Sequence, residues 1–267
     1  MAYVTYDKIR AYFTNADAVS GNAGSDNILY ATSLSASSTT SLKRVKRIGQ
    51  EMDYYIQTGP KSSSVSANVL LIESGISQIT NLTGDSTIGS IISVPDYQFK
   101  KCFLKSFSMS LEPWKVASAA LQFDSYGLAT GSGVYAHAEQ QASSQALLSP
   151  LRATSIQFTA PNFSHTPISK YENISFDIQV DRVPNFVIGS EYPEKVSVSK
   201  ITKSLQVNGL CNADWLADYQ PNTTVTCTIT MSDATVFSVA GVLSNQTFSV
   251  DSNGVAKGGL QIIEEMV

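Results

Sequence analysis

Alternation of apolar and polar residues is the dominant pattern along this chain. Residues 106–111 read Ser-Phe-Ser-Met-Ser-Leu, and residues 224–230 read Thr-Val-Thr-Cys-Thr-Ile-Thr. A period of two sends successive side chains to opposite faces of a β-strand, so that one face is buried and the other is wet. The pattern therefore predicts an all-β protein in which most strands are half-buried.

Two long hairpins are predicted, at about 28–72 and 172–209. In the second, the apolar residues occupy even positions at Val196 and Val198 but odd positions from Ile201 onward. A shift of one residue in an alternating strand is typical of a β-bulge, which inserts one extra residue. We therefore expect a bulge near Lys200.

Each long hairpin is followed by a short helical candidate, at residues 73–82 and 212–219. Asn212 is a suitable N-cap for the second, because its side-chain oxygen can accept a hydrogen bond from the first helical turn. Closing hairpins follow, with turns at 112–114 and 251–254. The chain is thus predicted to be mainly β, with short flanking helices.

An internal repeat divides the chain into two halves. Residues 116–123 align with 255–262, an offset of 255 − 116 = 139, and Gly49 aligns with Gly189, an offset of 189 − 49 = 140. Similar blocks in the same order at one offset indicate a duplicated unit. We expect two tandem β modules, at 1–135 and 136–267, with an Ala-, Gly-, Ser- and Gln-rich linker at about 128–150.

Composition narrows the possible functions. Hydrophobic residues make up 43% of the chain, which is enough for a real core, whereas charged residues make up only 15%. A net charge of −4 argues against a surface built to grip nucleic acid, which needs clustered Lys and Arg. The basic run at 43–47 fits a solvated loop or strand end. No apolar run is long enough for a secretion signal or a membrane span, so we expect a soluble protein.

Candidate chemistry is sparse. His137 and His165 are the only histidines, and neither lies in a nucleophile motif, so exposed loop positions are expected. Cys102, Cys211 and Cys227 fit no metal or redox spacing and are expected to be small buried hydrophobes. These residues predict no catalytic, cofactor-binding or metal site.

Two further residue sets leave alternatives open. Asp177 and Asp181 could form a glycosidase carboxylate pair, but they also fit the solvated face of a strand. Trp114 and Trp215 stand beside a turn and a helix start, where they would anchor the core or an interface. We expect a protein that is not an enzyme.

Two sets of segments carry a resemblance to a known family. The first is the strand and turn at 174–190, with its first-half partner at 31–36, 45–49 and 58–60. The second is the hairpin at 104–123, with its partner ending at 260–263. Together they resemble the bacteriophage tail tube proteins. The resemblance implies modules that are β-barrels or sandwiches with a helix on one side.

The resemblance also implies an assembly. In that family six modules pair edge to edge around a β-lined channel, and the rings stack into a hollow tube that delivers DNA without specific binding. A two-module chain would close the ring as a pseudo-sixfold homotrimer, with a homohexamer as the alternative. Expected partners are the sheath or terminator, the tape measure and the baseplate, with no membrane. The chain would be a virion protein assembled in the host cytoplasm.

The resemblance also suggests where the contacts lie. The polar faces of the long-hairpin strands would line the channel, and the loops at 44–59 and 182–195 and the N-terminal arm would join subunits. Two other readings stay open: a baseplate hub or tail terminator ring, and a carbohydrate- or receptor-binding decoration protein.

Overall fold

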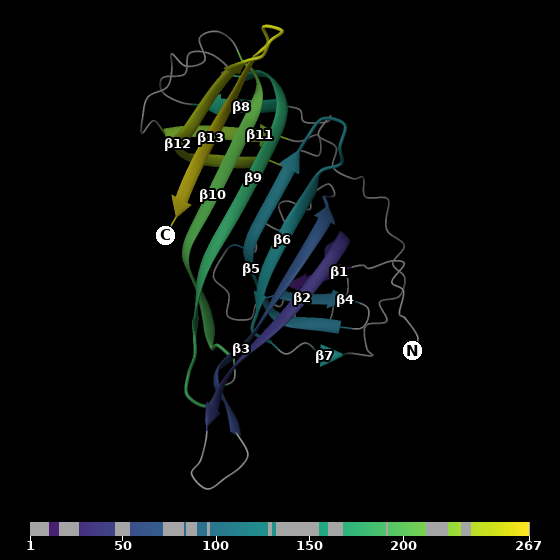
Figure 1. Ribbon diagram of the computed structural model, residues 1–267, viewed down its shortest axis with the longest axis vertical. Coiled ribbons are helices and arrows are strands. Elements are labelled where there is room, and N and C mark those ends of the chain that lie inside the picture. Colours follow the sequence, from purple (N-terminus) through teal and green to yellow (C-terminus); the bar gives the residue numbers. More distant parts are fainter. Residues whose placement is uncertain are drawn as a thin grey trace.

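The computed structural model describes residues 11–15, 27–45, 54–71, 83, 90–94, 97–127, 130–131, 155–159, 168–190, 192–211, 224–230 and 236–266. They form one 13-stranded antiparallel network, so the all-β prediction is confirmed (Figure 1). The predicted helices, both histidines and Trp215 lie outside these residues, as does most of the expected linker. The strands are β1 (Ala11–Asn15), β2 (Asn27–Val45), β3 (Tyr54–Leu70), β4 (Ser90–Val94), β5 (Tyr97–Leu111), β6 (Ser118–Ser125), β7 (Thr130–Gly131), β8 (Ser155–Thr159), β9 (Ile168–Asn185), β10 (Lys195–Cys211), β11 (Thr224–Thr230), β12 (Val236–Val250) and β13 (Ala256–Met266).

The strands of the first half close on themselves. β1 pairs β2, and the order continues through β3, β6, β5 and β4 before β4 returns to β1. Closure leaves this part of the molecule as a small antiparallel barrel, which removes sheet edges where it closes. The short β7 adds to β5 at Tyr97 and Gln98.

The strands of the second half pair in the same order. β9 pairs β10, and the order continues through β13, β12, β11 and β8. The two ends of this series approach each other where the Tyr171 hydroxyl of β9 donates to the Ile156 carbonyl of β8, at 3.5 Å. Burial raises the pKa of Tyr171 to about 12, so this hydroxyl keeps its proton and remains a donor.

Register repeats along with order in the closing hairpins. Phe107 of β5 pairs with Leu121 of β6, and Gln246 of β12 pairs with Leu260 of β13. Both residues of the second pair lie 139 positions after those of the first, since 246 − 107 = 139 and 260 − 121 = 139. The register shift between positions 104 and 106 of β5 recurs between positions 243 and 245 of β12, at the same offset. Bulges are local features of backbone geometry, so the two hairpins share their bend as well as their pairing.

The long hairpins repeat at an offset of 140. Leu34 pairs Ala67 in the first, and Ile174 pairs Val207 in the second. The shift between positions 31 and 33 of β2 matches the one between 171 and 173 of β9. The predicted bulge near Lys200 is confirmed, because the β9·β10 register shifts between Val198 and Lys200.

β5 and β9 join the two halves into one sheet. They pair antiparallel from Ser106 with Gln179 to Leu111 with Ile174, a contact called the internal seam below. The Phe107 and Phe176 rings meet across it edge to face, with centroids 6.1 Å apart. One hydrophobic core therefore runs through both halves. Its strand residues include Val65, Ala67, Val69, Phe107, Met109, Leu111, Ala119, Leu121, Phe123, Ile174, Phe176, Ile178, Val180, Leu205, Val207, Leu243, Leu260 and Ile262.

Four single-residue expectations can be compared with the structure, for three cysteines and one tryptophan. Cys102, Cys211 and Cys227 are all buried free thiols, as predicted. Burial raises the pKa of Cys102 and of Cys227 to about 12, so both stay protonated. Trp114 is not a core anchor: it is 85% exposed in the β5–β6 turn, with a positive φ of 64°. The exposure of Trp114 excludes the core role, and its interface role stays a prediction.

Candidate functional site

The feature with functional potential is a long sheet of eight strands. Its order is β2-β3-β6-β5-β9-β10-β13-β12. Figure 1 shows these strands running side by side along the molecule, with the shorter β4, β7, β8 and β11 crossing them. Because side chains alternate along each strand, one face of this sheet carries the core and the other carries polar groups. We call the second the polar face.

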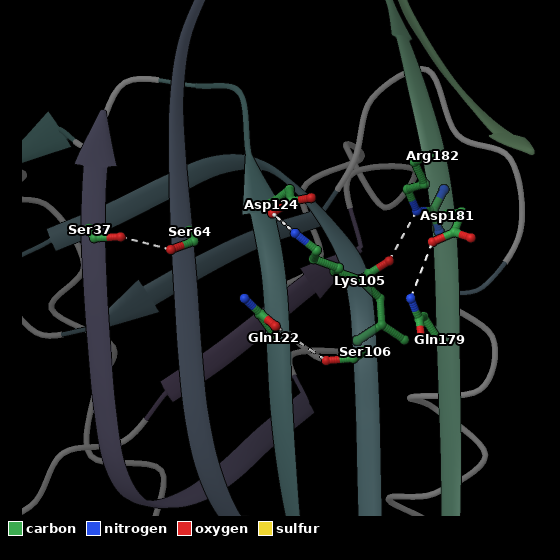
Figure 2. Close-up of polar contacts among 10 residues, drawn as sticks. Ser37, Ser64, Lys105, Ser106, Gln122, Asp124, Gln179, Asp181 and Arg182 are labelled. Carbon is green, nitrogen blue, oxygen red and sulfur yellow. Dashed lines mark hydrogen bonds and ion pairs between the residues drawn. The ribbon is translucent and has the colours of Figure 1, made fainter. Parts of the chain in front are cut away.

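Uncharged side chains dominate the polar face. Ser106 donates to Gln122 Oε1 at 3.5 Å, and the Ser37 and Ser64 hydroxyls are 2.8 Å apart. Figure 2 shows both pairs lying between neighbouring strands. Strand register continues such rows across both halves of the chain. One row comprises Ser35, Ser66, Gln122, Ser106, Gln179, Thr202 and Glu265.

Three lysines on this face lie close to carboxylates. Lys105 Nζ lies 3.6 Å from Asp124 and Lys200 Nζ lies 2.7 Å from Glu265. Figure 2 shows the first pair. A third pair joins Lys257 to Glu172 at 3.0 Å. These pairs are exposed or half-exposed and contribute little to stability, but they cancel positive charge locally.

The carboxylate pair considered from sequence lies on the same face. Asp177 and Asp181 both come from β9, and Asp181 accepts a hydrogen bond from Gln179 Nε2 at 3.4 Å (Figure 2). The exposure of Asp181 and the partial exposure of Asp177 fit a solvated strand face. Within the described ranges, no group of three or more His, Cys, Asp or Glu side chains could hold a metal ion.

The two outer edges of the eight-stranded sheet have no described strand along most of their length. β1 pairs β2 only at Asn27 to Leu29, so the rest of β2 has β3 on one side alone. β11 pairs β12 only as far as Val242, so β13 is the one described strand that pairs with residues 245–250. In the part of the chain that the structure describes, neither stretch has a strand on its outer side. The edge of a sheet is the place where a further strand can be added.

Exposed apolar residues accompany the β12 edge. Phe248 is 41% exposed and Val250 is 56% exposed. The residues 139 positions earlier, Met109 and Leu111, are only 1% and 3% exposed. β9 covers those two in the internal seam, and no described strand covers the β12 pair. Phe248 and Val250 therefore match Met109 and Leu111 in register but differ from them in exposure.

Apolar side chains also gather at the hairpin tips. Val187 and Ile188 are exposed in the β9–β10 turn, and Tyr54 and Tyr55 are exposed at the start of β3. These positions fall within the loops at 44–59 and 182–195 that the sequence suggests for subunit contacts. Residues 46–53 and 191 of those loops, and residues 1–10 of the N-terminal arm, lie outside the described residues. The basic run is described only at 43–45, where Lys43 and Arg44 are exposed at the end of β2.

Sequence comparison adds no family assignment. No known family model matches the chain, and no curated protein shows significant similarity to it. None of the described residues forms a helix long and apolar enough to cross a membrane. The strand geometry therefore carries the functional argument.

Proposed function

We propose that this chain is a structural virion protein of a bacteriophage tail, built from two copies of one tube-type module. Copies of it form rings that stack into a hollow tube for DNA delivery. The observation that supports this most is the repetition of strand order, register and bulge position in the two halves. The internal seam adds support, because two modules already sit edge to edge in one sheet.

The shared sheet favours three chains in each ring. Each chain contributes eight long strands, so three chains give 3 × 8 = 24 strands in a closed sheet. A barrel of that size is wider than those that leave an aqueous channel at 16–18 strands. A homohexamer with the second module outside the ring would have to separate β5 from β9. That separation would expose the core of the internal seam, which makes the homohexamer less favourable.

The polar face suits the inner wall of such a tube. Hydroxyl and amide groups offer no fixed positive charge to phosphates, and three of the lysines on this face, Lys105, Lys200 and Lys257, are paired with carboxylates. Asp177 and Asp181 add negative charge, which repels a polyanion weakly and lets it slide. DNA would then pass without specific binding, while the exposed hairpin tips meet the next ring or other tail proteins.

Negative-stain microscopy of the purified full chain tests this function. We expect long hollow tubes whose end views have threefold symmetry with six similar lobes. Single rings that do not stack would instead favour a baseplate hub or tail terminator. Dispersed single chains at all concentrations would contradict any ring function and favour a decoration protein.

A further inference from the structure

We propose that a cluster of aromatic rings and cations holds the tip of the β9–β10 hairpin against the first half of the chain. The inference concerns the single chain and goes beyond the proposed ring function. Three members come from the first half and three from the hairpin. We call this group the tip cluster, and it consists of Lys101, Phe103, Tyr126, Arg182, Phe186 and Tyr192.

Two of its contacts join the hairpin to a pair of first-half rings. The Arg182 guanidinium lies over the Phe103 ring, 5.6 Å from the centroid, and Phe186 meets the Tyr126 ring edge to face at 6.4 Å. Phe103 and Tyr126 also contact each other, with centroids 5.9 Å apart. Cation–ring and ring–ring contacts of this kind are attractive because of the ring quadrupole. The strand pairs of the internal seam do not reach these residues, so the cluster holds the hairpin beyond the seam.

A third contact involves a strained backbone position. Lys101 Nζ lies 5.3 Å from the centroid of the Tyr192 ring. Lys101 has a φ of 53°, which is uncommon for a residue that carries a Cβ. Such strain persists only where surrounding contacts determine it. Here the Lys101 carbonyl accepts a hydrogen bond from the Tyr126 N–H at 3.1 Å, so one residue contacts two other members of the cluster.

Burial around the cluster shows that one side of the hairpin tip is covered. Phe103 pairs with Asp124 on the polar face, yet it is only 3% exposed and lies outside the main core. In the hairpin, Val196 is 1% exposed and also lies outside that core, and Pro193 is buried nearby. Two strands alone cannot bury side chains so fully. The tip therefore packs on another part of the chain.

Hydrogen bonds within the turn extend this hold to its exposed residues. The Ser190 N–H donates to the Val187 carbonyl at 3.2 Å, and Ser190 Oγ donates to the Tyr192 carbonyl at 2.7 Å. Val187 and Ile188 are 47% and 107% exposed. They stand between Phe186 and Tyr192, which both belong to the cluster. The cluster therefore positions two apolar side chains at the surface.

The tip cluster belongs to one hairpin only. Adding 139 to the β5 and β6 side of the cluster, or subtracting 140 from the hairpin side, gives six equivalent positions. None of them is aromatic, so the β2–β3 hairpin cannot be held by the same set of rings. The equivalent residues are Ala240, Val242, Glu265, Leu42, Lys46 and Met52. The two long hairpins of one chain are therefore not interchangeable.

Hydrogen–deuterium exchange of the dilute, unassembled full chain tests the cluster. Tyr126→Ala removes two ring contacts, so amide exchange in residues 186–196 should rise about tenfold. Exchange in the seam at residues 174–178 should change less than about twofold, because the seam has its own strand pairing. Tyr126→Phe keeps the ring and should leave both segments unchanged. Val242→Ala, at the position equivalent to Phe103, should not alter exchange at the tip.

Lys101→Gly separates the side chain from the strained backbone. Gly adopts a positive φ without strain, so a purely structural role predicts unchanged or slower exchange. Loss of the cation predicts exchange at the tip that is about two- to fivefold faster. Lys101→Arg keeps the cation and should restore slow exchange. Adding Tyr192→Leu to Lys101→Gly should accelerate exchange no further, because both changes remove one contact.

Each outcome decides for or against the cluster. Unchanged exchange at the tip of Tyr126→Ala would overturn it. Equal acceleration at the tip and in the seam would also overturn it, because Tyr126 would then support the whole sheet. Unchanged or slower exchange in Lys101→Gly would remove the cation from the account. These results hold for single chains, so they stand whether or not copies assemble into rings.

Discussion

β5 and β12 have matching positions in the strand order and matching register, but they lie in different environments. The first part of each strand pairs with a short strand, β4 or β11, and the rest lies in the long sheet. Each strand also has a bulge at the equivalent position and pairs with the next strand along the chain in the same register. They differ in their outer neighbour: β9 covers β5, whereas no described strand covers the end of β12. Burial along these strands is therefore decided by the neighbouring strand as much as by their own alternation. The same alternation of apolar and polar residues gives buried side chains in β5 and exposed apolar side chains in β12.

The largest expected effect is the loss of stability on truncating Met109, compared with its counterpart Phe248. Met109→Ala should lower the free energy of unfolding by about 2–5 kcal/mol, because it leaves a cavity in a fully buried site. Phe248→Ala should cost less than about 1 kcal/mol in the unassembled chain, since that side chain is partly exposed. Urea unfolding of dilute, unassembled protein measures both. Equal losses would mean that the β12 edge is covered within a single chain.

In assembly, in contrast to stability, a substitution at Phe248 should have a large effect. Phe248→Asp should abolish tube formation while leaving the single chain folded, because a buried charge at the contact between copies would have no partner. Circular dichroism checks the fold, and microscopy checks the tubes. Val236→Asp is the control, since Val236 is exposed at the far end of the same strand. Normal tubes from Phe248→Asp would remove the β12 edge from the contact.

A smaller effect is expected at Gly241, which stands where the first half has Cys102 (102 + 139 = 241). A Cβ at Gly241 would lie 2.1 Å from the Ile263 carbonyl oxygen of β13, so the strands would have to move apart. Gly241→Ala should cost about 1–3 kcal/mol, the usual range for overpacking. Val242→Ala, at the exposed neighbour, should cost about 0.5 kcal/mol or less. Similar melting curves for the two variants would show that β12 and β13 separate easily here.

Arg182 sharpens the comparison at the end of the seam. Its Nε donates to the Leu104 carbonyl at 3.0 Å, and its guanidinium lies over the Phe103 ring at 5.6 Å from the centroid (Figure 2 shows the hydrogen bond). Arg182→Ala should cost about 1–2 kcal/mol, as expected for a charged donor in a half-exposed site. The equivalent residue of β2, Leu42, is 59% exposed, and Leu42→Ala should change little. Thermal unfolding of both variants at one pH measures the difference. Equal shifts in melting temperature would mean that the contacts of Arg182 with Leu104 and Phe103 do not stabilise the end of the seam.

The smallest effect belongs to the polar face. Removing the Lys105–Asp124 pair with Lys105→Gln should cost about 0.2–1 kcal/mol at low salt and less at high salt, because both side chains are partly exposed. Denaturant melts at two ionic strengths measure this. A loss of several kcal/mol would mean that this face is shielded from water in the single chain.

Sequence periodicity predicts much of this fold because alternation is a local signal. It places the buried faces of β5, β6, β9 and β11, and the shift in parity locates the bulge between Val198 and Lys200. It fails on β2, where alternation suggests one face for Tyr30, Thr32, Leu34 and Ala36. The register shift between Ala31 and Ser33 inserts one residue and breaks that face. Ala31 therefore packs against the core together with Leu34, although one position is odd and the other even.

The candidate site was only partly predictable for a different reason. The polar face follows from alternation, and the repeat offset aligns Phe248 and Val250 with Met109 and Leu111. Their exposure does not follow, because it depends on which strand lies beside them across more than sixty residues of chain. The β5–β9 pairing is such a long-range contact. A repeat in sequence thus indicates equivalent strands, and only the sheet order reveals which of them lacks a neighbour.

An electron cryomicroscopy reconstruction of the assembled protein tests the central claim most directly. We expect a closed inner sheet in which internal seams alternate with contacts between copies, three of each. A reconstruction in which the eight-stranded sheets of neighbouring chains do not join would contradict the account.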